Sequence, residues 1–158
     1  MKWETAKPLH SMKRMLIGEH IHTIDEKNRL SLPAKFRKEL GKVVVLAPGL
    51  DKSIFMFTVV EWKKIANKLS ESSLLQADNR SFNRFMFGGA VEVDVDSSGR
   101  ILVPDFLKDR AVLKNKVAII GVQNRVEIWN DKEWSTYKKN VEDHANELAE
   151  KLGQVGVL

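Results

Sequence analysis

Apolar and polar residues follow two periodicities along the chain. In AVEVDVD, residues 90–96, valines alternate with acidic residues, which is the period of a β-strand. Two β-branched runs, residues 43–46 and 117–120, are each followed by a turn (PGLD, QN) and a second apolar run, which predicts two hairpins. After each hairpin, helical spacing of apolar residues predicts an amphipathic helix, with Trp62, Ile65 and Leu69 in the first and Trp134, Tyr137, Val141, Ala145, Leu148 and Leu152 in the second.

These elements occur twice because the sequence contains an internal repeat. Residues 15–33 (MLIGEHIHTIDEKNRLSLP) align with residues 86–104 (MFGGAVEVDVDSSGRILVP) at an offset of 71. Self-similarity at a fixed offset indicates a duplicated structural unit. Each copy is predicted to contain an extended strand, a tight turn, a second strand, a short helix opening at Pro33 or Pro104, a hairpin and an amphipathic helix.

We therefore expect an α+β protein built from two fused copies. The start of each amphipathic helix has a capping-box pattern, with Thr58 three residues before Glu61 and Asn130 in the equivalent place. The predicted division is a disordered N-terminal extension (1–14), a first repeat (15–73), a helical connector (74–85), a second repeat with a C-terminal helix (86–152) and a tail (153–158).

The composition is that of an ordinary soluble globular protein, with 43% hydrophobic and 30% charged residues over 158 positions. No apolar run has the length of a membrane span, residues 1–14 lack the apolar stretch of a signal peptide, and cysteine is absent, so we expect a cytoplasmic protein. The net charge of +5 permits a nucleic-acid partner without requiring one. Between Lys27 and Lys42, however, there are six cations and one acid, which is typical of an anion-binding surface or a solvated helix face.

The two copies share the motif D-x-x-x-R, as DEKNR (25–29) and DSSGR (96–100). An aspartate that opens a turn can accept hydrogen bonds from the amides that follow it, and asparagine and glycine, found at the fourth place, best tolerate a positive φ. The arginine that ends each motif is either held by the aspartate as an internal brace or displayed to a ligand. Four residues are predicted to shape the two turns: Asp25, Asn28, Asp96 and Gly99.

Residues 94–105, DVDSSGRILVPD, also match the ligand spacing of an EF-hand calcium loop. The repeat argues against a calcium site, because Asp94 and Asp105 correspond to Thr23 and Ala34 in the first copy. The segment before the loop has strand periodicity, whereas an EF-hand requires a helix there. We therefore expect no metal at this turn.

His20 and His22 would point to the same side of a strand, where they could hold a metal ion. No third ligand is evident, and valines stand at the equivalent positions of the second copy, which indicates a packed face. A catalytic interpretation would pair His22 with Asp25 or Ser31, but the sequence contains neither a glycine-rich phosphate loop nor a nucleophile motif. We expect no bound metal, no cofactor and no enzymatic activity.

In each copy a short strand that starts near M-x-x-G leads to the D-x-x-x-R turn and then to a P-x-x-[FL]-[RK] helix. Together with the specific stretch G-E-H-x-H-x-I-D-E-K-N-R-L-x-L-P-A-K-F-R, this order resembles the MraZ family, which belongs to the AbrB-like swapped-hairpin transcription factors. The resemblance covers about residues 15–137. The first copy has Asn28 where the family usually has glycine, and residues 1–14 have no counterpart in the family.

The resemblance implies a pseudo-dimeric β-barrel made from two swapped hairpins, and a homo-oligomeric ring of eight or more subunits. It also implies a bacterial regulator, associated with the nucleoid, that binds short direct repeats in double-stranded DNA upstream of the operon for division and cell-wall genes. Neither a small-molecule substrate nor a membrane partner is expected.

Within this resemblance, Arg29 is the expected main contact to a base or phosphate, with Lys27 beside it, because arginine is well shaped to bind guanine in the major groove. Arg100 is expected to be the second contact, because its turn lacks the lysine. Lys35 and Arg37 are further expected phosphate contacts. The competing hypothesis is a ring-forming protein-interaction scaffold in which the arginines are structural braces.

Overall fold

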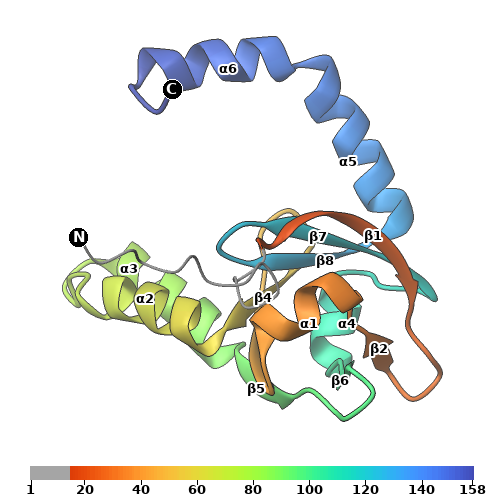
Figure 1. Ribbon diagram of the computed structural model, residues 1–158. Helices are drawn as coiled ribbons and strands as arrows, with labels where there is room; N and C mark the ends of the chain where they lie inside the picture. The colour runs from red at the N-terminus through yellow and green to blue at the C-terminus, as the bar shows by residue number, and fades with distance from the viewer. Residues whose placement is uncertain (1–14) are drawn as a thin grey trace, which may run out of the picture.

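The computed structural model describes residues 15–158, and the disorder expected for residues 1–14 concerns a segment outside this range. Its largest feature is an antiparallel six-stranded sheet with the order β1-β7-β8-β4-β3-β5, beside a two-stranded ladder of β2 and β6 (Figure 1). The strands are β1 (Ile17–Thr23), β2 (Arg29–Ser31), β3 (Val43–Pro48) and β4 (Ile54–Thr58) in the first repeat, and β5 (Val91–Asp94), β6 (Arg100–Leu102), β7 (Lys116–Val122) and β8 (Val126–Asn130) in the second.

The two repeats exchange strands, so each completes the other. β1 of the first repeat pairs with β7 of the second, and β5 of the second pairs with β3 of the first. β2 pairs with β6, with Leu30 opposite Ile101 at the centre of the ladder. This exchange follows from the duplication, because each copy contains strand edges that its own hairpin does not cover.

The described strands do not form the closed barrel that the family resemblance implied. β1 and β5 lie at the two edges of the six-stranded sheet. After β1 the chain turns through the first D-x-x-x-R motif, and the β-pairing of the described residues across this turn is limited to an isolated bridge between Ile24 and Leu30. β2 and β6 therefore pair with each other instead of extending the edges of the large sheet.

The main core is shared by the two repeats. Leu30 and Phe36 from the first repeat and Ile101 and Leu107 from the second are at most 1% exposed and belong to one apolar cluster. Burial of a side chain of this size typically contributes about 1.5–3 kcal/mol. Because equivalent residues of both copies line the same core, neither copy buries its apolar face without the other.

Two short helices start where the sequence predicts. α1 (Ala34–Leu40) follows Pro33, and α4 (Asp105–Arg110) follows Pro104. The fixed φ of proline suits the start of a helix. α1 ends at Gly41, whose φ of 77° and ψ of −157° lie in a region that is essentially restricted to glycine.

The longer helices begin at the predicted capping residues. Oγ1 of Thr58 accepts a hydrogen bond from the backbone N–H of Glu61 at 3.1 Å, and Oδ1 of Asn130 accepts from that of Glu133 at 3.2 Å. Oδ1 of Asn130 also accepts from the backbone N–H of Lys132, so the first cap satisfies one and the second cap two of the backbone donors that a helix start leaves unpaired. Thr58 caps α2 (Val59–Ser70), which is followed by α3 (Ala77–Gly88). Asn130 caps α5 (Asp131–Asp143), which is followed by α6 (Ala145–Gln154).

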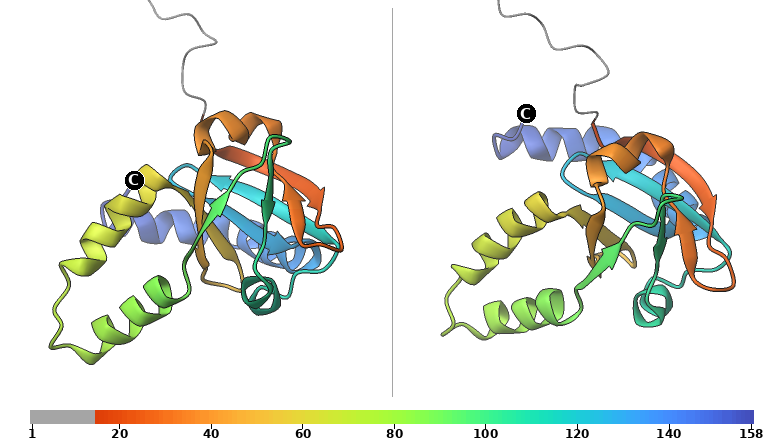
Figure 2. Two further views of the ribbon diagram at one scale, coloured as in Figure 1. Left: turned by 90° about the horizontal axis from the view of Figure 1, so that it is seen from below. Right: turned by 60° about the horizontal axis from the view of Figure 1, so that its bottom comes forward.

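Two helical pairs project from the sheet, α2 with α3 and α5 with α6 (Figures 1 and 2). The connector expected at residues 74–85 is helical from Ala77 to Gly88. The C-terminal segment, expected as one helix, is divided at His144, whose backbone N–H donates to the carbonyl of Val141 instead of continuing the regular ladder. Of the helices described, none combines the length and apolar character needed to cross a membrane.

Candidate nucleic-acid interface

The first D-x-x-x-R motif forms the tight turn between β1 and β2. Oδ1 of Asp25 accepts hydrogen bonds from the backbone N–H groups of Lys27 (2.8 Å) and Arg29 (2.9 Å). The other carboxylate oxygen, Oδ2, accepts a hydrogen bond from Nε of Arg29 at 2.8 Å. One aspartate side chain therefore holds both the backbone of the turn and the arginine that ends it.

The second motif has the same geometry between β5 and β6. Oδ1 of Asp96 accepts from the backbone N–H groups of Ser98 and Arg100, and Oδ2 accepts from Nε of Arg100, all at 2.9 Å. The backbones also match, with φ of 59° at Asn28 and 75° at Gly99. This left-handed conformation is one that asparagine and glycine adopt more readily than other residues.

In both turns the ion pair uses only one edge of the guanidinium group. Nε of Arg29 and of Arg100 faces the aspartate, and within residues 15–158 the Nη1 and Nη2 groups of these arginines make no hydrogen bond. The two side chains are 38% and 36% exposed. An arginine that braces its turn therefore still has two NH₂ groups for a ligand.

β2 and β6 present both arginines on one face of a two-stranded ribbon. The central pair of the ladder is buried, and side chains alternate along a strand, so the flanking residues face outward. Arg29 lies opposite Leu102, and Arg100 lies opposite Ser31. The two arginines are thus diagonal neighbours, which places them roughly 7–8 Å apart in a regular ladder.

The first turn is also held by the short helix of the other repeat. Nδ2 of Asn28 donates to Oδ1 of Asp105 at 2.5 Å, and Oδ1 of Asn28 accepts from Nζ of Lys108 at 2.9 Å. Both partners belong to α4. The fourth residue of the motif therefore connects the first turn to the second repeat.

The second turn is held from the opposite direction by α1. Arg37, which stands at the position equivalent to Lys108, donates from Nε to the carbonyl oxygen of Leu32 at 2.9 Å. Its side chain packs over Gly99, where an added Cβ atom would lie 2.4–2.6 Å from Arg37 atoms. Glycine at this position thus leaves room for the arginine as well as permitting the positive φ.

The remaining predicted cations differ in their surroundings. Lys27 and Lys35 are exposed, and their ammonium groups make no hydrogen bond or ion pair within the described part of the chain. Ser98 takes the place of Lys27 in the second turn. The first turn therefore has one more cation than the second, although Glu26, where the second turn has Ser97, leaves the net charge of the two turns equal.

The two histidines of β1 contact β2 and α1 of the same repeat. Nδ1 of His22 is 2.6 Å from the carbonyl oxygen of Ser31, and the ring of His20 meets that of Phe36 edge-on at 5.1 Å. Burial lowers the pKa of His20, and the charges of His22 and Lys35 lower it further. Across residues 15–158, no cluster of three or more histidine, aspartate or glutamate side chains is placed to hold a metal ion.

The hydrogen bonds of the turns favour ionised aspartates. The backbone N–H of Arg29 is the main cause that lowers the pKa of Asp25 below its ordinary value of 3.8, and the Arg29 side chain adds to it against a smaller opposing effect of desolvation. The backbone N–H and side chain of Arg100 lower the pKa of Asp96 in the same way. Both carboxylate oxygens of Asp96 accept hydrogen bonds from within the turn, and the element before the turn is the strand β5 instead of a helix. The local structure therefore gives the EF-hand interpretation no support.

Three residues of this region were not anticipated from the sequence. Lys108 and Asp105 hold the first turn, and Leu102, which is 58% exposed, shares the outward face of the ribbon with the arginines. The repeat could have indicated Lys108, because the offset of 71 aligns it with Arg37, which was already a candidate. The position of Leu102 depends on the pairing of β2 with β6, which the sequence does not specify.

Fold and site together define a class of protein: a duplicated, strand-exchanged α+β protein that displays two braced arginines on one exposed β-ribbon. Comparison with known proteins agrees with the duplication. Residues 15–85 and residues 86–154 each match the family model described as "MraZ protein, putative antitoxin-like".

Relatives match over nearly the whole chain. A "Transcriptional regulator MraZ" of Caldanaerobacter subterraneus subsp. tengcongensis is 45% identical over 143 residues, covering 90% of this chain and 100% of the relative. Proteins of the same name from a Thermoanaerobacter species and from Heliobacterium modesticaldum are 44% and 45% identical, covering 90% and 87% of this chain and 100% and 96% of the relatives. The chain belongs to the MraZ family, and these relatives are named transcriptional regulators.

Proposed function

We propose that this protein is a DNA-binding transcriptional regulator that recognises short direct repeats upstream of the operon for cell-division and cell-wall genes. The observation that carries the proposal is the pair of braced, exposed arginines on the outward face of the β2–β6 ribbon. The major groove of B-DNA admits a two-stranded ribbon, and arginine is the side chain best suited to bind guanine there.

The spacing of the arginines supports base recognition. Diagonal neighbours in a ladder are roughly 7–8 Å apart, which corresponds to about two base-pair steps at 3.4 Å each. The aspartate fixes the guanidinium plane of Arg29 through Nε before DNA arrives, so less side-chain freedom is lost on binding. The same interaction that braces the turn therefore prepares the free edge of the arginine for a base.

The two turns are proposed to contribute unequally. Arg29 is the main contact, with Lys27 on a neighbouring phosphate, and Arg100 is the second because its turn has Ser98 instead of a lysine. Lys35 and Arg37 on α1 are proposed phosphate contacts, although Nε of Arg37 is already bonded to the chain.

The proposal includes an AbrB-like swapped-hairpin unit assembled into a ring of eight or more subunits, acting on the nucleoid in the cytoplasm. The strand exchange between the repeats supports the swapped-hairpin part. One ribbon would bind a single repeat weakly, whereas several ribbons on one assembly would bind successive repeats at high effective concentration. An operator made of direct repeats suits such an arrangement.

A protein-interaction scaffold is the alternative function. Large apolar side chains are exposed on the projecting helical pairs, among them Leu74 and Leu75 in the turn between α2 and α3 and Leu148 on α6, as a protein-binding surface requires. In that case the arginines would serve only to hold the turns. Salt separates the two hypotheses, because binding to phosphates weakens steeply with ionic strength and binding through packed apolar surfaces does not.

The decisive experiment is a fluorescence-anisotropy titration with a duplex carrying the direct repeats upstream of this protein's own gene and with a scrambled duplex, across a salt series. Arg29→Ala should fold and assemble as the wild type does but lose roughly 5- to 150-fold of its preference for the repeats, the equivalent of one bidentate arginine contact. Arg84→Ala, which removes an exposed arginine from α3, is the matched control and should bind as the wild type does.

The outcomes distinguish the hypotheses. A preference for the repeats that is steeply salt-dependent in the wild type, and lost in Arg29→Ala alone, supports the DNA-binding regulator. Equal and negligible binding to both duplexes would reject it in favour of the scaffold. Unfolding of Arg29→Ala would show that the arginine is chiefly a brace.

A further inference from the structure

The outward face of the β2–β6 ribbon is nearly symmetric. An antiparallel ladder has a local two-fold axis through its central pair, here Leu30 and Ile101. That axis exchanges the two strands and with them Arg29 and Arg100, which also correspond at the repeat offset of 71. The hydrogen bonds and backbone conformations of the two turns match as well. A ribbon with full two-fold symmetry would bind a DNA site equally well in either direction.

The proposed operator, in contrast, has a direction. In a direct repeat the same bases follow in the same order in every copy, so ribbons that bind successive copies must all lie the same way round. Contacts to phosphates cannot impose this direction, because they carry no sequence information. Lys27, proposed to contact a phosphate, therefore does not orient the ribbon. A difference between the two strands that faces the bases is required.

One pair of outward-facing residues breaks the symmetry of the ribbon. The two-fold axis exchanges Ser31 and Leu102, so the face has a small polar side chain at one corner and a large apolar one at the other. Leu102 is 58% exposed. Arg29, directly opposite, leans toward its own turn because Nε is bonded to Asp25, and this leaves the leucine uncovered. The ribbon thus presents a bare apolar corner beside one arginine only.

The leucine matches one chemical group of the major groove. Thymine alone among the four ordinary bases carries a C5-methyl group there, and apolar side chains recognise thymine by contact with it. A serine hydroxyl can bond to the edges of several bases and so discriminates less. Arg29 with Leu102 would therefore select a guanine and a nearby thymine. At the other end of the ribbon, Arg100 with Ser31 would select only the guanine.

We propose that Leu102 contacts the C5-methyl group of a thymine close to the guanine bound by Arg29, and that this contact fixes the direction in which the ribbon lies on each direct repeat. The inference rests on the proposed function and deepens it by naming a residue that determines specificity through apolar contact with a base. Ser31, at the other end, leaves the second half of the site free of this requirement.

The test replaces thymine with deoxyuridine, which lacks only the C5-methyl group and pairs with adenine as thymine does. Single-repeat duplexes, each with one thymine replaced on either strand, are titrated with the full-length protein by fluorescence anisotropy. For the wild type, replacement of one particular thymine should weaken binding about fourfold, the equivalent of burying one methyl group. In Leu102→Ser, which makes the outward face symmetric, the same replacement should have no effect.

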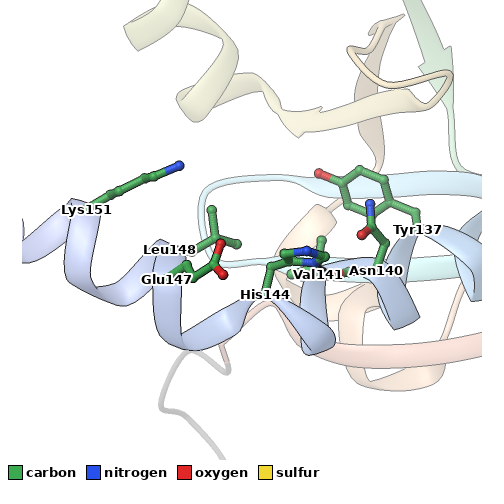
Figure 3. A pocket seen from close by; sticks show the side chains of 7 residues that line it. All are labelled: Tyr137, Asn140, Val141, His144, Glu147, Leu148 and Lys151. Atoms are coloured by element: carbon green, nitrogen blue, oxygen red, sulfur yellow. Dashed lines mark hydrogen bonds between the residues drawn. The ribbon is translucent and has the colours of Figure 1, made fainter.

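Leu148→Ser is the matched control. It removes a leucine that is 43% exposed and that lines the groove between α5 and α6 together with Tyr137 and Val141 (Figure 3). Figure 1 shows α6 well separated from β2 and β6, so this variant should keep the full effect of the uracil replacement. Circular dichroism checks that both variants are folded, as substitutions of exposed side chains should be. The wild-type scan needs no variant and tests the methyl contact by itself.

The direction of the ribbon is measured by cleavage of the DNA. The chain has no cysteine, so Ser98→Cys in the exposed second turn can carry a single iron chelate that cuts the DNA near it. This protein should cut about fourfold more on one side of the repeat than on the other, the same difference that the methyl contact provides. With Leu102→Ser added, the two sides should be cut about equally.

The outcomes separate this inference from the proposed function. Equal binding of repeat and scrambled duplexes by the wild type would reject both. A preference for the repeat that no uracil replacement reduces, or a uracil effect of unchanged size in Leu102→Ser, would reject the thymine contact and leave the DNA-binding function standing. One-sided cleavage that persists in Leu102→Ser would reject its role in direction. Loss of the uracil effect and of one-sided cleavage in Leu102→Ser, with both kept in the control, supports the proposal.

Discussion

At the scale of single residues, the two turns share a backbone conformation but differ in what their fourth residue contacts. Asn28 and Gly99 adopt the same positive φ, but Asn28 uses its side chain to bond α4 whereas Gly99 leaves space for Arg37. The residue types at the fourth place predicted the positive φ correctly. They could not predict the contacts beyond it, because those come from the helix of the other repeat.

This difference predicts that asparagine is poorly tolerated at position 99. The backbone of Gly99→Asn is acceptable, but its Cβ would displace the end of the Arg37 side chain and break the hydrogen bond of Arg37 to Leu32, which should cost about 0.5–1.5 kcal/mol. Adding Arg37→Lys, which recreates the lysine partner of Asn28 but not its aspartate partner because Ala34 stands in place of Asp105, should restore part of the lost stability. Thermal unfolding of the single and double variants measures both effects, and equal melting temperatures of Gly99→Asn and wild type would contradict the steric argument.

A second prediction concerns the titration of the first turn. Because the folded-state pKa of Asp25 is lowered, its contribution to stability is complete above the ordinary value of 3.8 and is lost as pH falls through the folded-state value. NMR of the carboxyl carbon should therefore give a midpoint below 3.8. In Arg29→Ala the midpoint should rise but stay below 3.8, since the backbone N–H groups still bond the carboxylate.

Asp96 is the internal control in that titration, because its bonds come from Ser98 and Arg100 and should not respond to Arg29→Ala. A midpoint for Asp25 at or above 3.8 in the wild type would show that the turn is open in solution.

At the scale of elements, local sequence signals predicted the helices and strands that depend on neighbours in the chain. The two prolines, Gly41 and the caps at Thr58 and Asn130 all mark boundaries that the structure confirms. The break at His144 was missed, because apolar spacing continues through it from α5 into α6. Helical periodicity records which side is apolar and does not reveal a change of direction.

The anchoring of α5 is predicted to depend on Glu19. Glu19→Gln removes the ion pair with Lys138, and α5 amides should then exchange hydrogen faster, by at most about fivefold because an exposed pair contributes no more than ~1 kcal/mol. Glu142→Gln, which removes only a 3.9 Å contact to the same lysine, is the control and should have little effect. Exchange measured by mass spectrometry should show no change in β7 or β8 for either variant.

The same anchor should weaken in acid. Lys138 is the main cause that lowers the pKa of Glu19 below its ordinary value of 4.5, so the anchor should persist at pH 4.5 and loosen only as pH falls further. The protection factor of the α5 amides, which corrects for the pH dependence of intrinsic exchange, should therefore be the same at pH 6 as at pH 7. A lower protection factor at pH 6 in the wild type would contradict this expectation.

At the scale of the whole molecule, the duplication was visible in the sequence but the pairing between the copies was not. The offset of 71 predicted two equivalent units. The pairing between copies depends on contacts between residues far apart in the chain. Examples are the pairing of β1 with β7 and that of Arg29 with Leu102 on β6. A single sequence contains no local signal for such contacts, so the shared ribbon face could not be derived, although both arginines could.

Strand exchange predicts that neither repeat folds alone as a monomer. Residues 15–75 and 76–158, produced separately, should be unfolded or pair with a second copy of themselves, because each lacks strands that the other supplies. Produced together, they should form a folded one-to-one complex with the melting behaviour of a single transition. A folded monomer of either fragment, detected by light scattering and circular dichroism, would contradict the shared core.

Strand exchange also has a consequence during synthesis on the ribosome. The partner of Ile17 is Val122, so β1 emerges roughly 100 residues before β7, a delay of about 5–20 s at ordinary elongation rates. Throughout that interval the nascent first repeat exposes unpaired strands, and a neighbouring ribosome on the same message carries an identical segment. Correct folding within one chain therefore competes with exchange between nascent chains, and the speed at which the second repeat is translated decides how often the wrong partner is met.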